Sequence, residues 1–234
     1  MATSKNSKKR LLDSKRKLVA KYDPKSPISE QYRTIRTNIL YSSIDNEIRS
    51  LMVTSSGPGE GKSTTTANLA VVFAQQGKTV LLIDADLRKP TVHYTFKLTN
   101  TIGLTSILTN QIDFMEAVNK TDENNLYILP SGPIPPNPSE LLGSKAMQHF
   151  LDRAMEEFDL IIFDTPPVLA VTDAQILGNL CQGTVLVVSS GKTEKDSLLK
   201  TKELLKATNG KLLGVVLNNK KADKKGSYYY YGTN

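Results

Sequence analysis

Short apolar runs recur along the chain from residue 51 to residue 218, and polar segments with helical spacing separate most of them. The runs are rich in β-branched residues and occupy residues 51–55, 79–84, 126–129, 159–164, 184–189 and 212–218. Continuous apolar runs are typical of strands buried on both faces, and helices between such strands form right-handed crossovers. The pattern predicts an α/β fold of three layers, with a mainly parallel central sheet flanked by helices.

The segments between the runs predict where the helices lie. Residues 62–76, 144–158 and 194–208 have helical periodicity, and a further helix over about 29–43 begins at Ser29, a plausible N-cap. The proline-rich stretch 130–142 predicts a rigid loop that leads into a helix capped near Ser139.

Composition and charge divide the chain into three parts. The length of 234 residues and the 39% hydrophobic content suit a single domain with a sizeable core. The net charge of +7 arises from residues 1–25, which hold nine Lys or Arg against two Asp. We therefore predict a basic, flexible arm at 1–26, a domain at 27–219 and a flexible tail with a tyrosine cluster at 220–234. A solvated leader is the favoured interpretation of the arm, ahead of binding to lipid, nucleic acid or an acidic partner.

The predicted location is the cytoplasm. The single cysteine, Cys181, excludes an internal disulfide framework and fits a reducing compartment. No apolar run approaches the roughly 20 residues that span a bilayer, and the basic N-terminus lacks the apolar region of a signal peptide. Work at a membrane would therefore need a partner that holds the chain there.

The first apolar run leads into "SSGPGEGKSTTTANLA", which has the form of a phosphate-binding P-loop followed by a helix. In such a loop, glycines let backbone N–H groups approach phosphate oxygens, and the helix adds its positive end. Lys62 is placed to reach the β and γ phosphates, and Ser63 to ligate magnesium. The strict motif has glycine at position 56, where this chain has Ser56. The strand before the loop and the helix after it still favour a P-loop NTPase fold.

Two other predicted strands end in acidic residues. Asp84 and Asp86 end the second run, and residues two apart on an extended chain point the same way. Neighbouring carboxylates repel unless a cation lies between them, and magnesium on the phosphates would be that cation. Asp164 follows four apolar residues at the end of the fourth run, as a Walker B aspartate does, and we expect it to hold magnesium.

The expected nucleotide is ATP. A guanine site has Asn-Lys-x-Asp after a late strand, whereas Asn219 and Lys220 are followed by an aspartate only at position 223, one residue too far. Asn218 or Asn219 is expected to contact adenine instead.

Together these motifs resemble the bacterial tyrosine kinase (BY-kinase) family, the cytoplasmic kinases of capsule and exopolysaccharide biosynthesis. The resemblance covers nearly the whole chain from about residue 26 and rests on the P-loop, "LLIDADLR" and "LIIFDTPP". It extends to the C-terminal tyrosines and to the family's E-x-x-R-x-x-R oligomerisation motif, matched by Glu30, Arg33 and Arg36. Because Glu30 and Arg33 are three residues apart, an ordinary surface ion pair would also explain them.

The resemblance implies in-line phosphoryl transfer from Mg-ATP to tyrosine. The nucleotide would be bound by Asn219 and by the loop residues Gly57, Gly59, Glu60, Gly61, Lys62, Ser63 and Thr64. Magnesium would be held by Ser63, Asp86 and Asp164. Asp84 would orient the acceptor tyrosine or accept its proton, and Lys62 and Asp86 complete the catalytic set. The acceptors would be the tail residues Tyr228, Tyr229, Tyr230 and Tyr231 of a neighbouring subunit.

The resemblance also implies partners. These are a homo-oligomeric ring, other protein substrates, an opposing tyrosine phosphatase and a membrane-protein activator whose cytoplasmic segment recruits the kinase to the inner face of the membrane. No nucleic acid is expected. The process regulated would be exopolysaccharide or capsule production.

Two alternatives remain at this point. One is a P-loop ATPase switch of the septum-positioning or plasmid-partition type, without kinase activity. Such switches have a second, signature lysine early in the loop, where this chain has Gly57, and they lack a tyrosine cluster. The other is a scaffold that binds ATP and transfers nothing, although three aspartates at strand ends argue against it.

Overall fold

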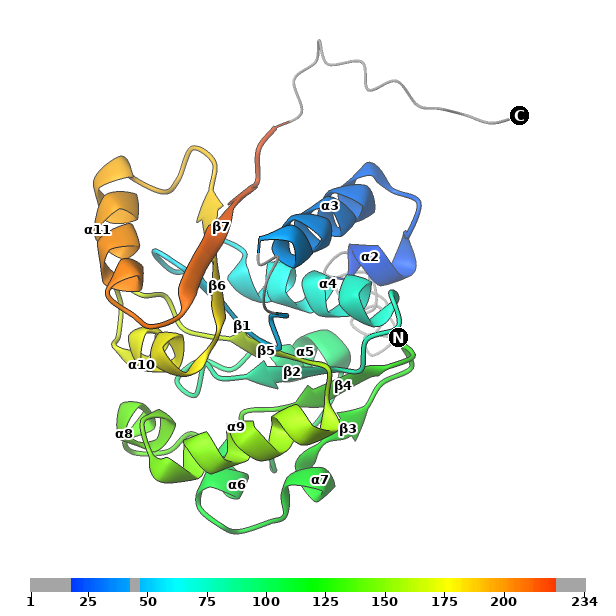
Figure 1. Cartoon of the computed structure of the whole chain (residues 1–234), viewed down its shortest axis with the longest axis vertical. Helices are drawn as coiled ribbons and strands as arrows, with labels where there is room; N and C mark the ends of the chain where they lie inside the picture. Colours follow the sequence, from blue (N-terminus) through cyan, green and yellow to red (C-terminus); the bar gives the residue numbers. More distant parts are fainter. Residues whose placement is uncertain (1–17, 43–46, 222–234) are drawn as a thin grey trace, which may run out of the picture.

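A seven-stranded sheet forms the middle layer of the computed structural model, which describes residues 18–42 and 47–221 (Figure 1). The strands run in the order β3-β4-β2-β5-β1-β6-β7, and all neighbours are parallel except β3 and β4. Their bounds are β1 (Ser50–Ser55), β2 (Val80–Asp84), β3 (Asn119–Lys120), β4 (Leu126–Leu129), β5 (Leu160–Asp164), β6 (Gly183–Ser189) and β7 (Lys211–Asn218). The predicted α/β fold with a mainly parallel sheet is confirmed.

Helices cover both faces of the sheet. One face packs against α2 (Val19–Tyr22), α3 (Pro27–Tyr41), α4 (Lys62–Ala74) and α5 (Val92–Phe96). The other packs against α6 (Leu104–Leu108), α7 (Phe114–Ala117), α8 (Pro138–Leu142), α9 (Lys145–Glu157), α10 (Asp173–Leu180) and α11 (Lys195–Lys206). Figure 1 shows α3 and α4 on one side of the strands, and α9 and α10 on the other.

Two hydrophobic cores follow from the alternation of side chains along each strand. In β1, Leu51 and Val53 belong to the core beneath α4, while Met52 between them belongs to the core beneath α9. The same alternation separates Leu82 from its neighbour Leu81 in β2. Successive strand residues point to opposite faces, so both faces of the sheet must be apolar. This requirement explains why the strands read as continuous apolar runs.

The structure corrects the predicted boundary of the N-terminal arm. Leu18 and Ala20, which were assigned to a flexible arm at 1–26, are buried, and α2 packs against α4. The backbone N–H of Ala20 donates to the side chain of Asn68 in α4 at 2.9 Å. An ordered segment therefore precedes α3. Residues 1–17 and the tail from 222 onward, with the four tyrosines, lie outside the described residues.

Local periodicity also missed several short elements. The strand β3 and the helices α5, α6, α7 and α10 contain eight residues or fewer, too few for a clear period. Within residues 18–42 and 47–221, the structure has no helix with the length and apolar character needed to cross a membrane.

Leu82→Ala tests the core beneath α4. Leu82 is fully buried, and removing its side chain should lower the free energy of unfolding by about 2–5 kcal/mol, through lost burial and the cavity left behind. Urea unfolding of the nucleotide-free chain measures the loss. Leu199→Ala is the matched control, because Leu199 is 47% exposed and its truncation should change stability little. Equal effects of the two substitutions would contradict the assigned core.

Candidate active site

The carboxyl ends of β1, β2 and β5 meet at one edge of the sheet. Asp84 of β2 is paired in register with Asp164 of β5, and Asp164 is paired with Val53 of β1. The chain continues past Val53 through the P-loop into α4, which begins at Lys62. Parallel pairing thus brings together three segments spread over more than a hundred residues of sequence, at the edge where open α/β sheets bind ligands.

The P-loop needs glycine at two of its positions. Gly59 and Gly61 have φ angles of +72° and +93°, in the left-handed region that side chains disfavour. A Cβ on Gly61 would lie 2.0 Å from Nδ2 of Asn218, so space as well as conformation requires glycine there. With the loop wound this tightly, its N–H groups and the start of α4 form a favourable site for an anion.

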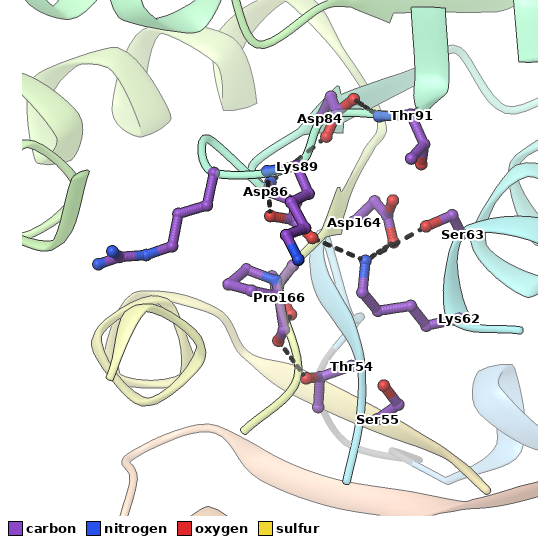
Figure 2. Close-up of polar contacts among 12 residues, drawn as sticks. Thr54, Ser55, Lys62, Ser63, Asp84, Asp86, Lys89, Thr91, Asp164 and Pro166 are labelled. Carbon is purple, nitrogen blue, oxygen red and sulfur yellow. Dashed lines mark hydrogen bonds and ion pairs between the residues drawn. The ribbon is translucent and has the colours of Figure 1, made fainter. Parts of the chain in front are cut away.

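Lys62 lies between two of the carboxylates at this edge (Figure 2). Its Nζ is 3.2 Å from Oδ2 of Asp86, 3.5 Å from Oδ1 of Asp164 and 3.2 Å from Oγ of Ser63. Burial on its own lowers the pKa of Lys62, but the charges of Asp164 and Asp86 outweigh burial and the net shift is upward. The ammonium therefore stays charged where a phosphate group would need it.

Asp84 holds the backbone that follows β2. One carboxylate oxygen accepts hydrogen bonds from the N–H groups of Thr91 and Val92, each at 2.9 Å, and the other accepts from the N–H of Asp86 at 3.3 Å. Burial, and then the charge of Asp164, raise the pKa of Asp84 to about 8. The Asp84 side chain is fully buried, whereas Asp86 keeps 6% of its surface exposed. Of the two predicted roles of Asp84, this burial favours orientation over direct proton acceptance.

Asp164 offers a free oxygen to a cation. Its Oδ1 accepts a hydrogen bond from Thr66 at 3.2 Å, while its buried Oδ2 has no partner among the described residues. Burial raises the pKa of this carboxyl, despite the opposing effect of Lys62.

The side chains at this edge fit magnesium. The described residues contain no cluster of three acidic, His or Cys side chains that forms a complete metal cage. Magnesium does not need one, since it is commonly held by one or two carboxylates, waters and phosphate oxygens. Ser63, Asp86 and Asp164 are hard oxygen donors gathered around the same lysine.

Glu60 acts within the loop through its side chain. One carboxylate oxygen accepts from the N–H of Ser56 at 3.0 Å and the other from Oγ1 of Thr193 at 2.6 Å. The carboxylate is thus occupied, and only the N–H of Glu60 remains to bind a phosphate. The N–H of Ser56, at the position where the strict motif has glycine, is likewise occupied.

The asparagines at the end of β7 lie beside the P-loop. Nδ2 of Asn218 donates to the carbonyl of Glu60 at 2.9 Å, and Nδ2 of Asn219 donates to Oγ of Ser189 at the end of β6 at 3.0 Å. The structure therefore places both predicted adenine contacts at the correct edge of the sheet. Contact with a base stays a prediction.

Asp173, Lys192 and Thr193 support the site and were not predicted from the sequence. Arg88 donates two hydrogen bonds to the buried carboxylate of Asp173, at 2.9 and 3.0 Å, and ties the segment after β2 to the start of α10. Lys192 and Thr193, in the loop after β6, contact the P-loop about 133 residues away in sequence. No local pattern marks these residues, because their partners come from distant segments.

A surface hollow of about 410 Å³ opens beside the first half of the P-loop. It is bordered by Gly57 and Pro58 on one side, by Leu169 after β5, and by Lys192 and Glu194 after β6. Lys62 and the carboxylates of Asp84, Asp86 and Asp164 do not border this hollow.

The predicted oligomerisation residues lie on α3, away from this edge. Glu30 and Arg33 form an ion pair, and Arg33 also donates to the carbonyl of Pro24 at 2.7 Å. Arg36 donates to the carbonyl of Val72 near the end of α4, also at 2.7 Å. All three thus have contacts within their own subunit, and a role between subunits stays a prediction.

Gly61→Ala tests the geometry of the loop. The added methyl group would collide with Asn218 and force a left-handed residue, so binding of Mg-ADP, measured by calorimetry, should weaken by at least about tenfold. Gly77→Ala is the matched control: its φ is +101°, nothing lies within 4 Å of the added carbon, and it is distant from the loop. That variant should lose about 1 kcal/mol of stability and bind normally. Normal binding by Gly61→Ala would contradict the proposed cradle.

Comparisons with known proteins agree with this geometry. Residues 48–208 match the AAA domain family. The chain is 58% identical over 233 residues to tyrosine-protein kinase YwqD of Bacillus subtilis (strain 168), covering 100% of this chain and 97% of that protein.

Solved structures give the same result. The crystal structure of the chimerical protein CapA2B2 matches with a TM-score of 0.86 and 46% identity, over 88% of this chain and 91% of that one. The kinase domain of the Escherichia coli tyrosine kinase ETK matches with a TM-score of 0.83 and 32% identity, over 91% and 84%. The P-loop and the three carboxylates at strand ends are what such a kinase needs, and the relatives of nearly equal length are tyrosine kinases. The chain therefore belongs to the bacterial tyrosine kinase family of capsule and exopolysaccharide biosynthesis.

Proposed function

We propose that this kinase uses Mg-ATP to phosphorylate the tyrosine cluster Tyr228–Tyr231 of a neighbouring copy, and other proteins, and thereby regulates exopolysaccharide or capsule production. The observation that carries the proposal is the position of Lys62. Its ammonium lies at the start of α4, within 3.5 Å of both Asp86 and Asp164 and beneath a glycine-rich loop. This arrangement of one cation and several hard oxygen donors suits a polyphosphate and a magnesium ion.

In the proposed reaction, the phenol oxygen of the acceptor bonds to the γ phosphorus as the bond to the β-phosphate oxygen breaks, and ADP leaves. Bound magnesium would neutralise phosphate charge, with Ser63, Asp86 and Asp164 as its protein ligands. Lys62 and the loop N–H groups orient the phosphates. The transition state is loose, so most of the rate comes from positioning and charge neutralisation.

The acceptor tyrosine needs a group that accepts its proton, because a phenol has a pKa of about 10 and is mostly protonated at neutral pH. Asp86 is the less deeply buried of the two carboxylates, and Asp84 fixes its position by accepting a hydrogen bond from its N–H group. The phenol proton passes to this acidic pair as the new bond forms.

Delivery of the tail to another subunit is supported by chain length. The last described residue, Lys221, follows β7 closely, and Tyr228 is seven positions further along the chain, a span of at most about 25 Å. An oligomer built through Glu30, Arg33 and Arg36 would bring one tail near the next site. A membrane-protein activator with a cytoplasmic segment, and an opposing phosphatase, complete the proposed cycle at the inner face of the membrane.

Mixing two complementary full-length variants tests transfer between subunits. A Lys62→Met chain keeps its tyrosines and loses a phosphate-neutralising charge, while a chain with Tyr228–Tyr231 changed to Phe keeps the site and lacks acceptors. Incubated alone with Mg-ATP, with the activator's cytoplasmic segment if the wild-type chain requires it, neither should gain phosphate on the tail. Mixed, the Lys62→Met chain should gain it, as read by intact mass spectrometry.

The wild-type chain is the positive control in that experiment. Label on the Phe variant's own tail region would show another acceptor, and label on wild type without label in the mixture would contradict transfer between subunits. ATP hydrolysis by the wild-type chain without any phosphotyrosine would instead support the ATPase-switch alternative.

Changing Arg33 and Arg36 to Ala tests the oligomer. The measured mass in light scattering should shift towards that of a monomer, because the predicted interface loses two guanidinium groups. Arg36 also binds the Val72 carbonyl, so the melting temperature must be recorded as a control for folding. An unchanged mass in a folded variant would assign these residues to contacts within one subunit only.

A further inference from the structure

Every carbonyl of the P-loop from Gly57 to Glu60 accepts a hydrogen bond from a side chain outside the phosphate cradle. Oγ of Ser55 donates to the carbonyl of Gly57 at 2.8 Å, and Nδ2 of Asn218 donates to that of Glu60 at 2.9 Å. Between them, Nζ of Lys192 donates to the carbonyls of Pro58 and Gly59, at 3.0 and 3.3 Å. One side chain therefore holds the two central peptide groups of the loop.

These contacts determine where the loop's N–H groups point. A trans peptide is planar, and its C=O and N–H point in opposite directions. Holding the carbonyls of Pro58 and Gly59 on the side of Lys192 turns the N–H groups of Gly59 and Glu60 to the other side. Neither N–H takes part in the backbone hydrogen bonds of the described residues, so both remain for an anion.

A second contact from the same loop holds the beginning of the P-loop. Oγ1 of Thr193 accepts from the N–H of Ser189 at 2.8 Å and donates to Glu60 at 2.6 Å, and Glu60 in turn accepts from the N–H of Ser56. The loop after β6 thus supports the P-loop at its beginning through Thr193 and in its middle through Lys192. Gly59 is also required for this approach, since a Cβ there would lie 2.9 Å from Nζ of Lys192.

We infer that Lys192 is a positioning residue of the kinase: it orients the N–H groups of Gly59 and Glu60 toward the phosphates without contacting the nucleotide itself. The inference rests on the proposed function, because it requires that the P-loop binds a nucleotide. Lys192 is exposed, and its ammonium makes charge-assisted hydrogen bonds, which are stronger than neutral ones. Removing the side chain therefore loosens the loop and leaves the core intact.

The experiment compares Mg-ADP binding by the full-length chain and three variants, measured by calorimetry. Lys192→Met removes the donor and should raise Kd about tenfold, as expected for loss of hydrogen bonds from a charged group. Lys192→Arg keeps the charge and offers several donors, so it should restore most of the affinity. Lys200→Met, on the exposed face of α11, removes the same charge and should bind as wild type does.

Two further measurements distinguish positioning of the loop from a loss of stability and from long-range electrostatic attraction. The melting temperature of the nucleotide-free chain should be the same for all variants, because the core is untouched. The loss in Lys192→Met should persist at about 1 M salt, where attraction over distances beyond about 3 Å is screened.

Unchanged affinity in Lys192→Met, an equal loss in Lys200→Met, a loss that disappears in high salt, or failure of Lys192→Arg to recover affinity would each overturn the inference. In all four cases wild-type binding would leave the proposed function standing. Absence of Mg-ADP binding by the wild-type chain would overturn both.

Discussion

One ammonium group among three carboxylates governs this edge of the molecule. Lys62 is held by Asp86 and Asp164, and Asp84, which lies beside Asp164, forms no ion pair with any described residue. Gathering these groups away from water is unfavourable unless opposite charges compensate, and the raised pKa values of Asp84 and Asp164 show that one lysine compensates only in part. The clearest sign of this deficit is Oδ2 of Asp164, which has no hydrogen-bond partner in the part of the chain that the structure describes. A site so rich in negative charge favours a second cation, which is what transfer of a phosphoryl group requires.

The rest of the fold supports that cluster. Parallel pairing of β1, β2 and β5 aligns their carboxyl ends, and α4 presents Lys62 and Ser63 from one side. Because both faces of the sheet are covered by apolar cores, the strands cannot shift in register without exposing one set of side chains. Binding sites on rigid strand ends keep their geometry better than sites on loops. The positions of the carboxylates therefore depend on hydrophobic packing far from the site itself.

The loops around the cluster are tied down by contacts of another kind. Arg88 with Asp173, Asn218 with the carbonyl of Glu60, and Lys192 with the P-loop each join segments that are distant in sequence. These contacts lie on the outside of the site and leave its interior to the ligand. A fold of this class hosts several chemistries, so function must be argued from such a site and not from the architecture alone. Here the site and the relatives agree on a tyrosine kinase.

The sequence by itself determined those features of this protein that depend on residues close together in the chain. The ends of the six longer strands lie within one residue of the predicted runs, because apolar runs can be recognised from neighbouring residues alone. The P-loop and the three strand-end aspartates were located in the same way, from the spacing of their motifs. The boundary of the arm at residue 26 was wrong, since burial of Leu18 and Ala20 depends on α4. The roles of Lys192, Thr193 and Asp173 were likewise decided only by tertiary structure. Their partners lie 85 or more residues away, and a hydrogen bond across that separation exists only once the sheet has brought both segments to one edge.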